Sequence, residues 1–224
     1  MKKDKPGELR LFGPIEAPVK GAIFDLDGVL VDTAKYHYLA WKRLARELGF
    51  DFSEEDNERL KGVSRLRSLE ILLELGHCRM NDAQKAAAAG RKNAWYVEYL
   101  GTLGEEALLP GSRDYLVRLR EGGVRIALGS ASKNAPLILE RLNISRLFDA
   151  VIDGNSLSRA KPDPEVFLRG AEALGLAPGD CVVFEDSLAG IQAAKAGRMA
   201  VIGVGKPELL PGADWYIGSL RDLL

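Results

Sequence analysis

The chain has 224 residues, of which 46% are hydrophobic and 28% are charged, and its 31 Lys and Arg nearly balance its 32 Asp and Glu. This composition is typical of a globular chain with a sizeable core, and a net charge of −1 excludes the strongly basic surface of a nucleic-acid-binding protein. The apolar stretches are too short for a membrane-spanning helix and the first residues carry no signal-peptide pattern, so we expect a cytoplasmic protein without nucleic-acid or membrane partners.

The beginning of the chain divides into an extension and a first strand. Residues 1–19 carry Lys, Pro and Gly without a sustained period, and we interpret them as an N-terminal extension outside the core. The apolar run that ends at Phe24 then breaks into a turn that contains Asp25 and Asp27. This pattern predicts a strand that is buried on both faces and carries carboxylates at its C-terminal end.

Helical periodicity follows the first strand. From Thr33 the apolar residues recur every four positions, with Asp32 or Thr33 as the N-cap and Gly49 as the stop. Similar patterns predict helices at 65–75 and 82–100. No strand pattern occurs between about 35 and 105, so we expect this stretch to be entirely helical.

The remainder of the chain alternates between strands and helices. The patterns predict helices at 112–120, 135–142, 165–174 and 189–196, and strands at 125–128, 150–152, 181–184 and 199–204. This alternation implies right-handed βαβ units and a parallel sheet with helices on both faces. The predicted fold class is therefore α/β, with a core made of residues 20–34 and 106–224 and a helical insertion at 35–105.

Polar residues gather at the carboxyl ends of the predicted strands, where open α/β sheets bind their ligands. The groups are Asp25 with Asp27, residues 130–134, Lys161, and residues 185–187. Carboxylates crowded at one edge repel each other unless a hard cation is present, and oxygen ligands without His or Cys indicate Mg²⁺. Hydroxyls at a helix start and a lysine would position and neutralise a phosphate, so the edge favours phosphoryl chemistry.

Each of these signals also has an ordinary structural explanation. An Asp-x-Asp pair is common in turns, Ser130 and Ser132 could cap a helix, and most lysines in loops are solvated. Any one of these explanations is at least as good as the functional one when it is taken alone. Their occurrence together at one sheet edge favours a functional site.

The motifs resemble a known superfamily. Asp25-Leu26-Asp27-Gly28-Val29, Ser130 after a strand, Lys161-Pro162 and Glu185-Asp186 occur in the order typical of the haloacid dehalogenase superfamily, over essentially all of residues 20–224. The resemblance implies a Rossmann-like core with an inserted α-helical cap domain. It also implies that Asp25 is the nucleophile, which becomes an aspartyl phosphate, and that Asp27 is the general acid and base.

The same resemblance implies a metal site and two groups that stabilise the transition state. Mg²⁺ would be held by the Asp25 carboxylate, the main-chain carbonyl of Asp27 and Asp186, with Glu185 adjacent. The transition state would be stabilised by Ser130 and Lys161.

The insertion resembles the cap of one family within the superfamily. Residues 32–41, 61–65, 68–69 and 91–93, together with 130–134, look like the β-phosphoglucomutases. Such a mutase presents either end of a sugar bisphosphate to its nucleophile, and Arg65 is implied to grip the distal phosphate. The other implied substrate and phosphate contacts are Thr33, His37, Trp41, Gly62, Val63, Ser64, Ser68, Lys92, Ser130, Ala131, Ser132, Lys133, Asn134 and Lys161.

Two cap assignments have plain alternatives. His37, implied to couple cap closure to the alignment of Asp27, would otherwise be a packing residue of an amphipathic helix. Arg65 and Arg67 would otherwise form an exposed basic face. Leu66 and Arg67 also replace the acidic residues that follow the cap arginine in such mutases, which leaves the sugar selectivity of the cap open.

The leading hypothesis is a Mg²⁺-dependent phosphomutase that converts β-D-glucose 1-phosphate to D-glucose 6-phosphate. The reaction would pass through β-D-glucose 1,6-bisphosphate and an aspartyl phosphate, in a monomeric enzyme whose partner is a small-molecule sugar phosphate. The core motifs also fit a sugar-phosphate phosphatase, in which water accepts the phosphoryl group. A more remote alternative is a non-catalytic phosphate-binding protein.

Overall fold

A six-stranded sheet lies at the centre of the computed structural model, which describes residues 12–15, 19–60 and 63–224. Its spatial order is β3-β2-β1-β4-β5-β6, and every pairing is parallel. The strands are β1 (Gly21–Phe24), β2 (Arg125–Gly129), β3 (Ala150–Ile152), β4 (Cys181–Glu185), β5 (Ala200–Val204) and β6 (Trp215–Ile217). The parallel sheet predicted from the alternating pattern is confirmed.

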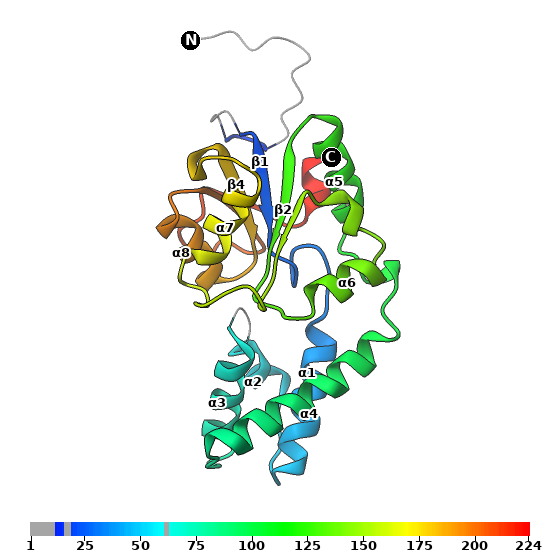
Figure 1. Ribbon diagram of the computed structural model, residues 1–224, viewed down its shortest axis with the longest axis vertical. Coiled ribbons are helices and arrows are strands. Elements are labelled where there is room, and N and C mark those ends of the chain that lie inside the picture. The colour runs from blue at the N-terminus through cyan, green and yellow to red at the C-terminus, as the bar shows by residue number, and fades with distance from the viewer. Residues whose placement is uncertain (1–11, 16–18, 61–62) are drawn as a thin grey trace.

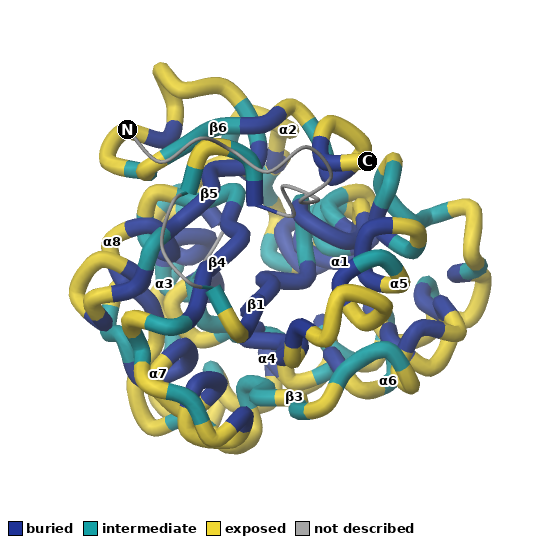
Figure 2. Tube along the Cα trace, turned by 90° about the horizontal axis from the view of Figure 1, so that it is seen from above, coloured by how far each residue is buried: buried dark blue, intermediate teal, exposed yellow. Residues whose placement is uncertain are grey.

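Helices cover both faces of this sheet (Figure 1). One face packs against α5 (Ser112–Glu121) and α6 (Ala135–Arg141), and the other against α7 (Glu165–Ala173) and α8 (Leu188–Ala196). In β1, Ala22 and Phe24 belong to the first of these apolar clusters, whereas Ile23 belongs to the second. Figure 2 shows β1 and β4 buried in the middle of the molecule, because apolar side chains point to both faces.

Four helices between β1 and α5 gather at the end of the core where the strands terminate (Figure 1). They are α1 (Ala34–Glu47), α2 (Glu54–Glu58), α3 (Arg65–Leu75) and α4 (Asp82–Leu100). They enclose an apolar cluster of their own, in which Trp41 and Leu44 of α1 meet Leu69 and Leu72 of α3. The described residues between 35 and 105 contain no strand, as expected. The division into domains at 34 and 105 stays a prediction.

Two short elements escaped the sequence patterns. Helix α2 has five residues and buries only Asn57, so it lacks an apolar stripe; Ser53 and Asp56 hold its first turn in a capping box. Strand β6 has three residues at the edge of the sheet, too few to show an alternation. Short 3₁₀ segments occupy Glu105–Ala107, Ser145–Leu147, Pro178–Asp180 and Leu220–Leu223.

The expected extension contributes the buried Phe12 to the core, and Ile15 and Val19, which are partly buried, pack against the same cluster. Residues 1–11 and 16–18 lie outside the described part of the chain, but Phe12 is buried and its ring centroid lies 6.5 Å from that of Phe184. The expectation that residues 1–19 stay outside the core is therefore wrong for Phe12. A single aromatic residue among charged and turn residues has no periodicity that could predict its burial.

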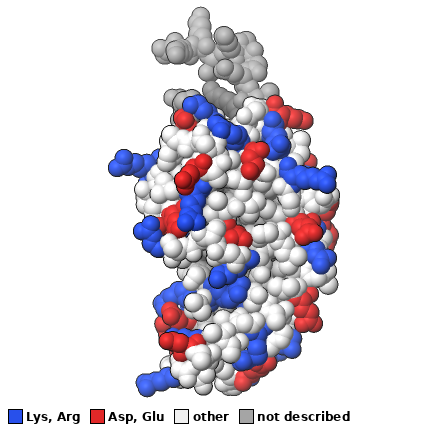
Figure 3. Space-filling model, in the orientation of Figure 1, with Lys and Arg blue, Asp and Glu red and all other residues white. Residues whose placement is uncertain are grey.

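The face of the molecule drawn in Figure 3 carries no large patch of a single charge. Among the described residues no helix is both long and apolar enough to cross a membrane. Figure 3 shows acidic and basic side chains interspersed over that face.

Candidate active site

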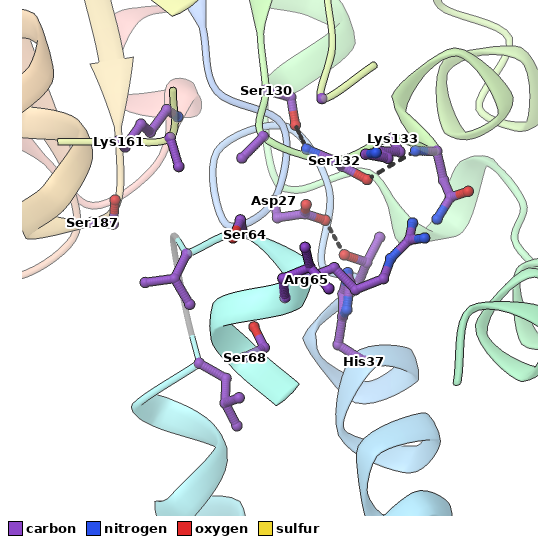
Figure 4. Close-up of a pocket in the computed structure, with 18 of the residues that line it drawn as sticks. Asp27, His37, Ser64, Arg65, Ser68, Ser130, Ser132, Lys133, Lys161 and Ser187 are labelled. Atoms are coloured by element: carbon purple, nitrogen blue, oxygen red, sulfur yellow. Dashed lines mark hydrogen bonds between the residues drawn. The ribbon is translucent and has the colours of Figure 1, made fainter. Parts of the chain in front are cut away.

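A cavity of about 800 Å³ lies where the carboxyl ends of the central strands face α1, α3 and α4. Gly62 lies outside the described residues; every other site residue expected from the sequence lines the cavity. They are Asp25, Asp27, Thr33, His37, Trp41, Val63, Ser64, Arg65, Ser68, Lys92, Ser130, Ala131, Ser132, Lys133, Asn134, Lys161, Glu185 and Asp186. Figure 4 shows part of this cavity, with Lys161 and Ser130 on the core side and Arg65 and His37 on the helical side.

A buried lysine joins two carboxylates at the sheet edge. Asp25 follows β1 and Glu185 ends β4, and the strands pair with Phe24 opposite Phe184, so the two acids emerge side by side. Lys161 Nζ lies 2.5 Å from Asp25 Oδ1 and 2.6 Å from Glu185 Oε1. The other oxygen of Glu185, Oε2, accepts hydrogen bonds from the amide and the hydroxyl of Ser187. Both oxygens of Glu185 are therefore engaged by protein groups.

This edge carries more negative than positive charge. Burial raises the pKa of Asp25 to about 7, although the charge of Lys161 opposes the rise. Burial, and then the charges of Glu185 and Asp25, raise the pKa of Asp186 well above its ordinary value. Burial alone would lower the pKa of Lys161, but the same two carboxylates raise it. One ammonium group thus faces three carboxylates, and a further cation would relieve their repulsion.

The edge carries oxygen donors that suit a hard cation. The described residues contain no cluster of three or more His, Cys, Asp or Glu arranged as metal ligands. Asp25 and Asp186 nevertheless supply oxygen donors beside Gly28, whose φ is +80°, and a Cβ built there would lie 1.9 Å from Asp186 Oδ2. Glycine keeps this space open, and carboxylate and carbonyl oxygens suit Mg²⁺.

Asp27 is held by the residue that precedes the first helix. Thr33, fully buried at the N-cap of α1, donates its hydroxyl hydrogen to Asp27 Oδ1 (Figure 4). The Thr33 side chain consequently makes no capping bond, and Asp32 Oδ1 accepts from the amide of Ala34 instead. Burial raises the pKa of Asp27 and the Thr33 bond opposes the rise. The raised pKa favours the protonated form that a general acid needs.

The helical side of the cavity is basic. Lys92 Nζ lies 2.9 Å from His37 Nδ1 and 4.6 Å from the ring centroids of Trp41 and Tyr96. Burial, and then the charge of Arg65, lower the pKa of Lys92 to about 7. Burial and the charges of Lys92 and Arg65 lower the pKa of His37 well below its usual value. Both shifts disfavour a second positive charge at the cavity wall, where His37 Nδ1 and Lys92 Nζ share a hydrogen bond.

Arg65 and Arg67 do not form one exposed face. Arg67 is exposed and pairs with Glu70 and Glu74 on its own helix, at 3.1 and 3.3 Å. Arg65 is half-buried and extends from the beginning of α3 toward the core (Figure 4). Among the described residues no ion pair links Arg65 to an acid. Arg65 is thus a cation in the cavity wall whose guanidinium donors have no hydrogen-bond partner in the described part of the chain.

The loop after β2 presents hydroxyl, ammonium and amide groups to the cavity. Ser130 is buried, and its Oγ accepts from the amide of Ser132 at 3.1 Å. Ser132 Oγ in turn accepts from the amide of Asn134 at 3.2 Å (Figure 4). Lys133 is exposed at the cavity margin. These local bonds set the loop conformation and leave the Lys133 ammonium available to an anion.

Sequence reasoning missed one residue that positions Lys161. Glu165 is buried and its carboxylate accepts from the amide and hydroxyl of Ser158 and from the amide of Arg159. Arg169, one turn later on α7, lies 3.2 Å from it. Glu165 thus anchors the loop that leads to Lys161. An acid in the first turn of a helix is so common that no sequence signal distinguished this one.

The chain is similar to known proteins in sequence and in fold. A family model described as haloacid dehalogenase-like hydrolase matches residues 19–198. The chain is 43% identical to the β-phosphoglucomutase of Bacillus subtilis, over 92% of each chain. It is 32% identical to a phosphorylated carbohydrates phosphatase of Thermotoga maritima, over 87% of this chain and 92% of that one. A crystal structure of β-phosphoglucomutase from Clostridium difficile superimposes with a TM-score of 0.88 at 39% identity, covering 92% of this chain and 93% of that one.

Proposed function

Because the chain belongs to the haloacid dehalogenase-like hydrolases, we propose that its cavity carries out phosphoryl transfer between the two ends of a hexose phosphate. The reaction is the isomerisation of β-D-glucose 1-phosphate to D-glucose 6-phosphate through β-D-glucose 1,6-bisphosphate. One observation carries the proposal: the cavity has Asp25 and Asp27 on one side and Arg65 and Lys92 on the other. A substrate with two phosphates requires two such sides.

Asp25 is the proposed nucleophile. In its phosphorylated form, the phosphoryl group is attacked by the 6-hydroxyl of β-glucose 1-phosphate, whose proton passes to Asp27. The bond from phosphorus to Asp25 breaks, and glucose 1,6-bisphosphate forms. The bisphosphate then turns round, so that the phosphate on C1 lies beside Asp25. Asp25 attacks the phosphorus of this phosphate, and Asp27 returns the proton to the C1 oxygen as its bond to phosphorus breaks. Glucose 6-phosphate departs and Asp25 is phosphorylated again.

Three groups are proposed to support this exchange on the core side. Lys161 neutralises charge beside Asp25, and Ser130 places its hydroxyl at the same edge. Mg²⁺ would be held by the carboxylates of Asp25 and Asp186 and the main-chain carbonyl of Asp27. When bound, it supplies positive charge that offsets the repulsion between carboxylate and phosphate. The bonds of Glu185 to Lys161 and Ser187 favour a supporting role for Glu185 beside the metal.

The helical side is proposed to bind the distal phosphate. Arg65 offers a planar guanidinium without an acidic partner among the described residues, which suits bidentate contact with phosphate oxygens. Lys92 adds a buried cation whose pKa would rise again beside an anion. Lys133 and Asn134 reach the same cavity from the core. Thr33 and His37 lie where α1 leaves the core, a placement that suits control of Asp27 as the helices approach.

Hydrolysis is the second candidate, because water could replace the sugar hydroxyl at Asp25. The similarity to a phosphorylated carbohydrates phosphatase supports this alternative. The higher identity to a β-phosphoglucomutase and the basic far side of the cavity favour the mutase. The proposed enzyme is cytoplasmic and acts on a small-molecule substrate. We propose a monomer, because its helical part has to move relative to the core.

One assay separates the two reactions. The protein is incubated with β-glucose 1-phosphate, Mg²⁺ and a trace of glucose 1,6-bisphosphate, and glucose 6-phosphate and free phosphate are followed together. A mutase converts substrate to glucose 6-phosphate with little free phosphate. Phosphate release in step with substrate loss would identify a phosphatase. Activity that persists in Asp25→Ala would contradict the nucleophile, and Arg65→Ala should lose isomerisation while hydrolysis is retained.

A further inference from the structure

We propose that Asn93 is a positioning residue that orients Asn134 toward the distal phosphate, an inference that rests on the proposed function. Asn93 lies on α4 beside Lys92, and its Oδ1 accepts a hydrogen bond from Nδ2 of Asn134 at 2.9 Å. The two residues are 41 positions apart, and both line the cavity. This bond joins α4 directly to the loop that follows β2.

The bond selects one orientation of the Asn134 carboxamide. A carboxamide carries two N–H donors on one side and a carbonyl acceptor on the other, and a half-turn of the group exchanges them. In this structure Asn93 Oδ1 accepts from one of these N–H groups, which places the Asn134 nitrogen beside Asn93. The second N–H has no hydrogen-bond partner among the described residues and can donate to a phosphate oxygen, whereas the reversed amide would present a carbonyl that repels phosphate. The backbone of Asn134 is already held, because its amide donates to Ser132 Oγ.

Asn93 also links this orientation to the place of α4. Its neighbour Lys92 bonds to His37 of α1, so residues 92 and 93 contact α1 and the core loop respectively. If α4 moved away from the core, the bond to Asn134 would break while that to His37 remained. Asn134 is therefore fully oriented only when Lys92 is also beside the cavity. This coupling favours phosphoryl transfer to a bound sugar over transfer to water.

The test is a double-mutant cycle between the two residues. Asn93→Leu removes the acceptor and keeps a side chain of four heavy atoms branched at Cγ, and Asn134→Ala removes the group on which Asn93 acts. We expect Asn93→Leu to lower kcat/KM for β-glucose 1-phosphate roughly fivefold to tenfold, mainly through KM, and to raise the share of product released as free phosphate. In the Asn134→Ala background the same substitution should cause no further loss.

A matched control lies on the same helix. Glu98→Leu makes a comparable polar-to-apolar change at an exposed position of α4 away from the cavity, and its kcat/KM should equal that of the wild type. If Asn93→Leu does not fold, Asn93→Ala makes the same comparison with a residue that favours helix. Equal losses in both backgrounds would overturn the inference, because a purely structural role of Asn93 does not depend on Asn134.

The assay also keeps the inference separate from the proposed function. Substrate loss is measured together with both products, so the cycle is obtained whichever product forms. A wild type that only hydrolyses its substrate would overturn the proposed mutase activity. The positioning role would still be tested, by whether the effect of Asn93→Leu on kcat/KM disappears in the Asn134→Ala background. If the wild type isomerises its substrate but the effects of the two substitutions on kcat/KM simply add, the positioning role of Asn93 is overturned and the proposed function stands.

Discussion

The ammonium group of Lys161 lies 2.5 Å from Oδ1 of Asp25, and both side chains are buried at the carboxyl edge of the sheet. Lys161 lies 2.6 Å from Glu185 as well, so one cation serves two acids. A buried carboxylate without a partner is costly, because neither water nor another charge compensates it. The same contact therefore matters for stability and for the proposed nucleophile.

Replacing Lys161 should lower both stability and activity. We expect Lys161→Met to reduce the free energy of unfolding by about 3–5 kcal/mol, because it leaves two buried carboxylates without their cation. It should also reduce kcat/KM at least about 100-fold. Urea unfolding and steady-state kinetics measure the two effects. Lys195→Met is the control, since its ion pair with Asp214 is exposed and should contribute about 1 kcal/mol at most. Equal costs for the two variants would contradict the prediction.

Mg²⁺ should stabilise the folded protein through Asp186. We expect saturating Mg²⁺ to raise the Tm of the wild type, since a ligand present at about 100 times its Kd adds about 2.7 kcal/mol. Asp186→Asn should remove most of this rise, because it removes one of two proposed carboxylate ligands. Thermal unfolding with and without Mg²⁺ measures the difference. Asp51→Asn, at an exposed position, should respond to Mg²⁺ like the wild type, and the same response in Asp186→Asn would exclude this ligand.

The absence of a side chain at Gly28 should be required for metal binding. Gly28 and Gly49 have similar positive φ values, +80° and +88°, so alanine brings a similar backbone strain of about 1–2 kcal/mol at either position. Only at Gly28 would the new Cβ collide with Asp186; at Gly49 nothing lies within 4 Å. Gly28→Ala should therefore abolish the Mg²⁺-dependent rise in Tm, and Gly49→Ala should keep it. If Gly28→Ala kept the rise in Tm, the space beside Asp186 would not be required for Mg²⁺ binding.

Lys92 should lower stability in a pH-dependent way. Its folded-state pKa is about 7, below the ordinary 10.5, because burial disfavours the charged form. Well below pH 7 the lysine is charged in both states and the full penalty applies. Between pH 7 and 10.5 the unfolded chain binds more protons than the folded one, so stability rises with pH. Lys92→Met should therefore raise the Tm by about 5 °C or more near pH 6, with a gain that disappears toward pH 10.5.

The activity of the same variant should fall, because the distal phosphate loses a cation. The kcat/KM of the wild type should decline as the pH rises through about 7 and Lys92 loses its charge. The kcat/KM of Lys92→Met should be low at every pH and should not show this decline. Lys206→Met, at an exposed position, serves as the control for both measurements. If Lys92→Met raised the Tm equally at pH 6 and pH 10, the lowered pKa of Lys92 in the folded protein would be contradicted.

Much of the architecture and of the site's composition was determined by the sequence itself. Strands that are apolar on both faces and alternate with amphipathic helices permit few arrangements other than a parallel sheet between helical layers. The carboxyl ends of such strands share one edge, so Asp25, Ser130 and Glu185 had to converge there although they are far apart in the chain. Local patterns are sufficient for these conclusions, because periodicity and strand order are properties of the chain.

Only the tertiary structure decided how the side chains are paired. The sequence left Asp32 and Thr33 as equal candidates for the N-cap of α1, and the fold places the Thr33 hydroxyl on Asp27 instead. It places Arg65 in the wall of the cavity and Arg67 on the surface, where Arg67 pairs with Glu70, although the two arginines are only two positions apart in the chain. It also joins Asn93 to Asn134 and Glu165 to the Lys161 loop. Such contacts depend on the distance and direction between elements remote in the chain, which no local period encodes.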